Sequence, residues 1–143
     1  MFGILIALLS GALMSIQGVF NTNVTKHTSL WVSTAFVQFS ALVVCLAVWA
    51  VSDRSSFGLL WKVPHKYTLL GGVIGAFITV TVIKGMNALG PAKATMLIVI
   101  AQLSISWLVE MFGMFGVDRQ PFSVRKLIGL LIAVIGVVTF ELS

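Results

Sequence analysis

The chain has 143 residues, of which 59% are hydrophobic and only 9% are charged, with a net charge of +5. A soluble domain carries about 25% charged residues, so this composition excludes an ordinary soluble fold and indicates that lipid surrounds most of the surface. The basic residues lie in short stretches between apolar runs, which is typical of membrane topology signals and argues against nucleic-acid binding.

Five apolar runs nearly fill the chain, and a helix needs roughly 20 apolar residues to cross a bilayer core. The runs are continuously apolar, whereas the strands of a membrane β-barrel alternate polar and apolar residues, so helices are predicted throughout. We expect an all-α integral membrane protein with one transmembrane domain over residues 1–143. Its spans are predicted at about 2–23, 30–51, 67–89, 91–114 and 123–141.

The first two spans carry amides within apolar sequence. The first starts without a basic segment or a small-residue cleavage site, so we interpret it as a retained helix and not a signal peptide. Gln17 and Asn21 lie four residues apart near its end, and Gln38 lies near the centre of the second span. Each amide is expected either to line a polar path or to bond a neighbouring helix, and Asn21 also suits a helix end.

The third span carries Lys84, which is expected either to line a polar path or to extend its ammonium group to the membrane surface. Gly90 and Pro91 follow as a helix stop and a first-turn proline. The third and fourth spans are therefore predicted to form a tight antiparallel hairpin. Ser123 suits the position of a cap on the fifth span.

The fourth span holds the sharpest single feature, the acid Glu110. An acid at the bilayer centre costs at least about 2.5 kcal/mol, so we expect either a functional carboxylate or one that reaches the headgroups. Gln102, Ser106 and Glu110 recur at every fourth residue and form a polar stripe on one helix face. The stripe either lines a cavity or bonds another helix. Trp107 beside it is either an aromatic wall for an organic substrate or a lipid-facing residue.

The fifth span offers a surface for close helix packing and has no strong polar residue before Thr139, so we expect it to form a dimer contact. The small residues concerned are Gly129, Ala133 and Gly136.

The charge bias between loops is weak. With the N-terminus inside, six Lys and Arg residues lie on the inner side and three on the outer side. This favours that orientation only modestly. Dual topology is therefore possible, and we expect an antiparallel pair of ten helices, either a homodimer or a pair with an inverted paralogue. In such a dimer Glu110 of one chain shares a depth with Lys84, Gln17 and Asn21 of the other.

No catalytic motif is present, so an enzyme is not expected. Cys45 stands alone in an apolar run, and His27 and His65 lie in polar loops, so neither a metal site nor a cofactor is predicted.

Short motifs in a fixed order now point to a family. They are IQGVFN at 16–21, GGVIGA at 71–76, LGP at 89–91, AQ at 101–102 and EMFGMFG at 110–116. The chain resembles the YdcZ-like five-helix branch of the drug/metabolite transporter superfamily, which is related to EamA-like and small multidrug resistance transporters. The resemblance implies a bacterial inner-membrane protein that assembles as an antiparallel pair. The family typically has an aspartate at the position of Glu110, and this chain lacks the first-span glutamate of the small multidrug resistance proteins.

The leading hypothesis is a secondary transporter of a small organic solute. Glu110 is its coupling or substrate-binding acid, with Gln17, Asn21, Gln38 and Gln102 along the path. The alternatives are a small dual-topology ion channel and a non-transporting membrane subunit.

Overall fold

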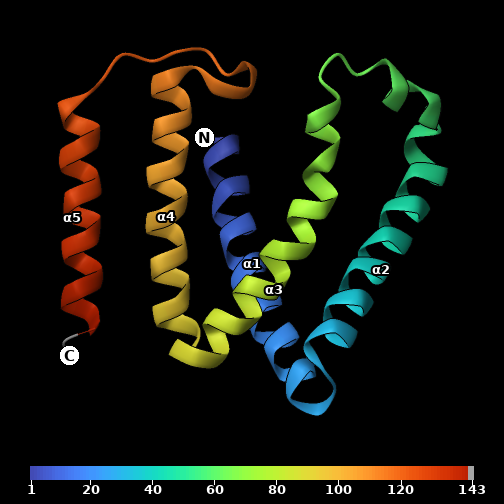
Figure 1. The fold of residues 1–143 in the computed structure, drawn as a ribbon, viewed down its shortest axis with the longest axis horizontal. Helices are drawn as coiled ribbons and strands as arrows, with labels where there is room; N and C mark the ends of the chain where they lie inside the picture. The colour runs from blue at the N-terminus through green and yellow to red at the C-terminus, as the bar shows by residue number, and fades with distance from the viewer. Residues whose placement is uncertain (142–143) are drawn as a thin grey trace. The chain divides into compact units, whose positions relative to one another are not determined.

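The computed structural model describes residues 1–141, and nearly all of them are helical (Figure 1). The main helices are α1 (Phe2–His27), α2 (Leu30–Val48), α3 (Gly71–Leu89), α4 (Pro91–Phe112) and α5 (Val124–Glu141). The described residues contain no strand, so the predicted all-α class is confirmed. Leu142 and Ser143, the end of the predicted domain 1–143, lie outside the described residues.

Within residues 1–141, four helical segments are long and apolar enough to cross a membrane, namely Phe2–His27, Leu30–Asp53, Lys66–Leu89 and Pro91–Phe112. Helix α5 differs because Arg125 and Lys126 lie in its first turn and Glu141 ends it. Its charge-free stretch covers only 127–140, about 21 Å at about 1.5 Å per residue, against a bilayer core of about 30 Å. Length and composition therefore support four of the five predicted crossings.

The chain divides into two compact units, Met1–Asn87 and Ala88–Ser143. In the first unit α1 contacts α2, and only Thr28 and Ser29 connect them. Ser29 has an extended backbone, and its hydroxyl accepts a hydrogen bond from the Val32 N–H at 3.2 Å. This side-chain cap satisfies one of the free N–H groups at the start of α2, so the turn is short and locally stable.

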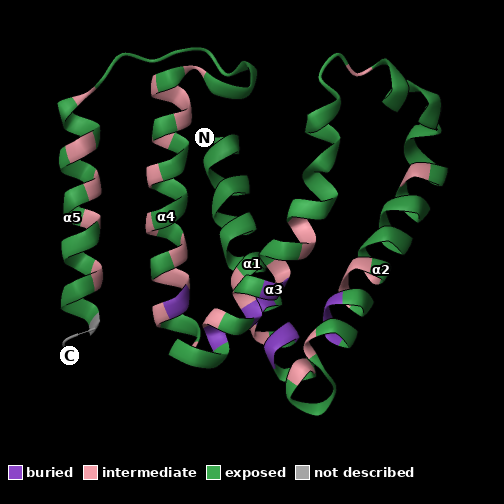
Figure 2. Cartoon of the chain, viewed as in Figure 1, coloured by how far each residue is buried: buried purple, intermediate pink, exposed green. Residues whose placement is uncertain are grey.

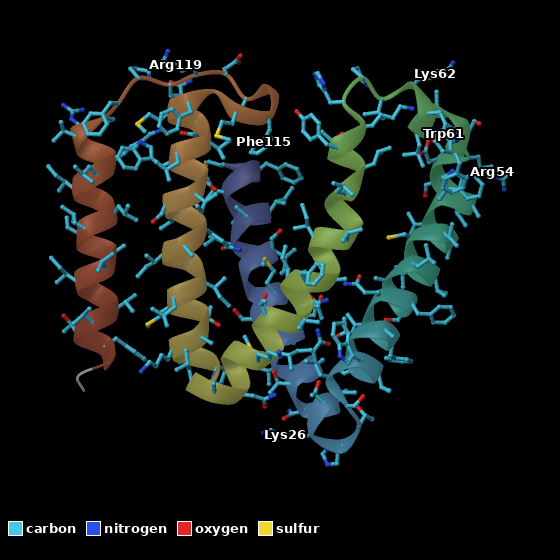
Figure 3. The ribbon with its side chains drawn as sticks, in the orientation of Figure 1. Lys26, Arg54, Trp61, Lys62, Phe115 and Arg119 are labelled. Atoms are coloured by element: carbon cyan, nitrogen blue, oxygen red, sulfur yellow. The ribbon has the colours of Figure 1, made fainter. Side chains whose placement is uncertain are left out.

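The connection between α2 and α3 is longer and consists of three short helices, η1 (Trp49–Asp53), η2 (Phe57–Lys62) and η3 (Lys66–Leu70). Figure 3 shows Arg54, Trp61 and Lys62 along this connection, with Lys26 at the opposite end of the same unit. The Trp49 indole N–H donates to the Ser55 carbonyl at 2.9 Å, which ties η1 to the segment that follows it. Basic and aromatic residues thus gather at a helix end, where a membrane meets water.

Polar residues are buried where α1 and α2 meet, while most large apolar side chains are exposed (Figure 2). The Ser33 hydroxyl is fully buried and donates to the Asn21 carbonyl at 3.1 Å. Further along α2, the Gln38 amide donates to the Thr79 hydroxyl of α3 at 3.2 Å. Lipid offers no hydrogen bonds, so polar side chains join helices to one another while apolar ones face outward.

The boundary between α3 and α4 follows the predicted pattern. Helix α3 ends at Leu89, Gly90 adopts a φ of +80°, and Pro91 is the first residue of α4. A residue with a Cβ rarely adopts this φ, and proline at the first helical position loses no helix hydrogen bond. The predicted helix stop at Gly90 and Pro91 is therefore confirmed.

Gly18 of α1 lies against the side chains of Met86 and Val82 of α3. A Cβ atom built on Gly18 would lie 2.5 Å from Met86 Cε and 3.3 Å from Val82 Cγ1, whereas one built on Gly11 would meet nothing within 4 Å. Met86 is itself 5% exposed, so its side chain has little free space into which to move. The absence of a side chain at Gly18 lets these two helices approach.

We therefore expect Gly18→Leu to destabilise the protein and Gly11→Leu not to. Overpacking of a filled contact costs about 1–3 kcal/mol, and both changes share the same gain in helix propensity, so their difference reports packing alone. The measurement is the thermal unfolding midpoint of the full chain in detergent. Equal midpoints for the two variants would contradict the close contact at Gly18.

Candidate functional site in the groove between α4 and α5

Helix α4 ends two residues after Glu110, and the following loop folds back onto that end. Gly113 adopts a φ of +63°, and a Cβ there would lie 3.1 Å from the Cβ of Arg119. The Gln120 N–H donates to the Glu110 carbonyl at 2.8 Å, and the Arg119 Nε donates to the Met111 carbonyl at 3.2 Å. These bonds satisfy carbonyls that the helix end leaves free, and they require glycine at the bend.

The fold-back continues through an aromatic contact that leads into α5. The rings of Trp107 and Phe122 have centroids 5.6 Å apart and are tilted by 44°. This geometry is within the range of favourable aromatic pairs. Two residues later Val124 begins α5, which packs along α4. The loop, on which Figure 3 labels Phe115 and Arg119, therefore sets how α5 starts beside α4.

The Lys126 ammonium donates to Glu110 Oε2 at 2.5 Å. The two side chains are 48% and 41% exposed, respectively. A pair this exposed is worth about 0.2–1 kcal/mol in water, so the fold does not depend on it. Both side chains are therefore partly accessible from outside the protein.

The ion pair borders a groove of about 290 Å³ between α4 and α5. Five further residues line this groove, and most of them are apolar: Leu103, Ser106, Trp107, Gly129 and Leu130. A Cβ built on Gly129 would meet nothing within 4 Å, so this glycine leaves space that a side chain would occupy. An apolar groove with a few convergent polar groups is the usual form of a small-molecule site.

Only two of the three residues of the predicted polar stripe line the groove. Ser106, Trp107 and Glu110 line the groove, whereas Gln102 is exposed and is not among the lining residues. Of the residues predicted for dimer packing, Gly129 lines the groove, Ala133 is half-buried and Gly136 is exposed. The groove is therefore lined by members of both predicted groups, the polar stripe of the fourth span and the small residues of the fifth.

One expectation for the fifth span was wrong. We expected no strong polar residue there before Thr139, but Lys126 lies inside α5 and binds Glu110. From the sequence, Lys126 was counted only as a loop charge. An antiparallel hairpin of the fourth and fifth spans places the start of α5 beside the end of α4. Assuming that hairpin would have brought Lys126 next to Glu110.

The remaining predicted site residues lie in the first unit. Gln17 and Lys84 are exposed. Asn21 is 8% exposed, and its backbone carbonyl accepts hydrogen bonds from the Ser33 and Thr25 hydroxyls. Gln38 bonds Thr79 and so links α2 to α3. Among the described residues no group of three or more His, Cys, Asp or Glu side chains is placed to hold a metal ion.

Glu110 lies near one end of α4, the helix Pro91–Phe112. At the rise of an α-helix it is about 13 Å along the axis from the middle of α4, while half of a bilayer core is about 15 Å. With α4 centred in the membrane, the carboxylate lies inside the core but close to its boundary. Such a position lets a charged group exchange partners with the aqueous side at lower cost than at the centre.

Exchanging the two charges of the pair tests its geometry. We expect Glu110→Lys alone and Lys126→Glu alone each to lower the thermal unfolding midpoint, because each places like charges side by side. The double variant should recover most of the loss, with a coupling free energy of about 0.2–1 kcal/mol from a double-mutant cycle. Additive losses in the double variant would contradict direct contact. Lys62→Glu, which reverses an exposed charge outside the groove, is the matched control.

Comparison with known proteins gives a match at the level of the family. A family model described as "Putative inner membrane exporter, YdcZ" matches residues 2–139, nearly the whole chain. No curated protein and no solved structure matches. The match agrees with the apolar helices, which fit a multi-pass protein of the inner membrane. The chain therefore belongs to the YdcZ family and is an inner-membrane transport protein.

Proposed function

We propose that this protein is a secondary transporter of a small organic solute and that Glu110 is the carboxylate that binds the solute or a coupling ion. The main support for this proposal is that Glu110 lies at an apolar groove, in contact with the half-exposed Lys126. An ionisable group inside a membrane helix is costly and is usually retained for function. A groove of about 290 Å³ suits a small solute and is too small for a macromolecule.

Exchange at Glu110 supplies a simple mechanism. In the resting arrangement the Lys126 ammonium occupies the carboxylate. A proton or a cationic group of the solute replaces that ammonium. Lys126, half exposed in the first turn of α5, is then released from Glu110. Binding of a proton or of the solute thus releases the Lys126 ammonium. The position of that charge therefore depends on whether the groove is occupied.

The working unit in this proposal is an antiparallel dimer of ten helices, with α5 as the fifth span of each chain. Transporters commonly form their sites between inverted halves, and a five-helix chain obtains that arrangement by pairing with an inverted copy. Arg125 and Lys126 then lie at the membrane boundary, where basic side chains reach the headgroups. The weak charge bias between loops permits both orientations.

Transport should depend on the Glu110 carboxylate. In proteoliposomes screened with organic amines, acids and zwitterions, we expect solute uptake or solute-dependent proton movement that falls at least tenfold in Glu110→Gln. Asp118→Asn, which neutralises an exposed loop acid, should retain activity. Uptake that is equal in Glu110→Gln and wild type would refute the proposed role of Glu110.

Filling the groove should block transport without unfolding the protein. Gly129→Leu places a side chain in open space, so we expect a normal unfolding midpoint and a loss of uptake. Gly72→Leu in α3 also meets open space but lies outside the groove, and it should leave uptake unchanged. Normal uptake in Gly129→Leu would show that solute passes elsewhere.

A further inference from the structure

The groove contains both members of an ion pair, and this limits which ligands fit it. A ligand that enters beside Glu110 meets the Lys126 ammonium already bound to the carboxylate. A purely cationic ligand would take Glu110 and leave Lys126 without its partner, and a purely anionic ligand would do the reverse. A ligand that carries both charges pairs with Glu110 and Lys126 at once, whereas a ligand with one charge forms only one of these two pairs.

From this we infer that the groove selects a zwitterionic solute with an apolar body. The solute's ammonium replaces Lys126 at Glu110, and its carboxylate binds the displaced Lys126. Lys126 is then a specificity-determining residue. This inference rests on the proposed function, since it names the substrate class of the same site.

The geometry also limits how the two charges of the ligand are spaced. Glu110 Oε2 and Lys126 Nζ are in direct contact, at 2.5 Å. A ligand with its ammonium and carboxylate on one carbon replaces this contact with the smallest displacement of Lys126. A ligand with its charges at opposite ends of a long chain would meet one partner only.

The rest of the groove accommodates an uncharged body. Leu103, Trp107 and Leu130 supply apolar walls, and Gly129 leaves open space between them. The groove volume is about 290 Å³. This volume is near the lower end of the range for small-molecule sites, which is about 300–1,000 Å³. An α-amino acid with a branched aliphatic side chain fits this volume, charge spacing and wall chemistry.

Three probes that share one aliphatic body test the inference. Leucine carries both charges, 3-methylbutylamine lacks the carboxylate, and 4-methylpentanoate lacks the ammonium. The measurement is binding of radiolabelled leucine to the purified full chain in detergent, with the other two as competitors. We expect leucine to bind the wild type about two- to fivefold more tightly than either competitor, which is what one additional exposed ion pair supplies. Leucine should also be taken up by proteoliposomes in a Glu110-dependent manner.

Substitutions of Lys126 and of Glu110 should shift the preference among the three probes in opposite directions. Lys126→Met frees the carboxylate, so the amine should bind at least as tightly as leucine, whose affinity falls about two- to fivefold. In Glu110→Gln the Lys126 ammonium is free instead, so 4-methylpentanoate should bind at least as tightly as leucine. A purely structural role for the pair would weaken all three probes equally in both variants. Lys62→Met, the matched change at an exposed lysine outside the groove, should leave the order unchanged.

Several results would overturn the inference. One is a wild-type protein that binds the amine or the acid as tightly as leucine, and another is an unchanged preference in Lys126→Met. A third is a protein that fails to bind leucine at 10 mM while carrying another solute through Glu110. That third result would leave the proposed function intact. Loss of every Glu110-dependent uptake would instead remove the proposed function itself.

Discussion

A peptide group in hydrocarbon has no water to bond, so each segment that enters a membrane must satisfy its own backbone. This constraint accounts for the helical fold and for the distribution of polar side chains. Ser33 and Gln38 direct their polar groups at neighbouring helices, while the large apolar side chains remain exposed. Among the described residues, four polar and four hydrophobic residues are buried, whereas the core of a soluble domain is mostly apolar.

The same constraint makes the ion pair at the groove informative. Hydrocarbon offers no partner to a charge, so opposite charges near the membrane boundary pair with each other or with water and headgroups. Glu110 and Lys126 reach each other only because the loop after Gly113 folds back and α5 starts beside the end of α4. The site thus depends on a backbone bend that no side chain of the pair controls.

Much of the fold was predictable from local sequence, and the site only in part. Continuous apolar runs predict helices, and Gly90 followed by Pro91 predicts the boundary between α3 and α4, because these signals act within a few residues. Glu110 was identified because an acid in an apolar run stands out. Lys126 was missed as its partner because the contact spans 16 residues. It forms only once the bend at Gly113 is known, and Gln102 was included because periodicity alone does not show where a groove ends.

The turn between α1 and α2 has a consequence for how the chain enters the membrane. Only Thr28 and Ser29 separate the two helices, and Ser29 already caps the second. A linker of two residues spans at most about 10 Å, so the end of α1 and the start of α2 lie at nearly the same depth in the membrane. The chain therefore turns back as soon as α1 ends, and α1 and α2 cross in opposite directions. Lys26 and His27, the last two residues of α1, mark the side on which this turn lies.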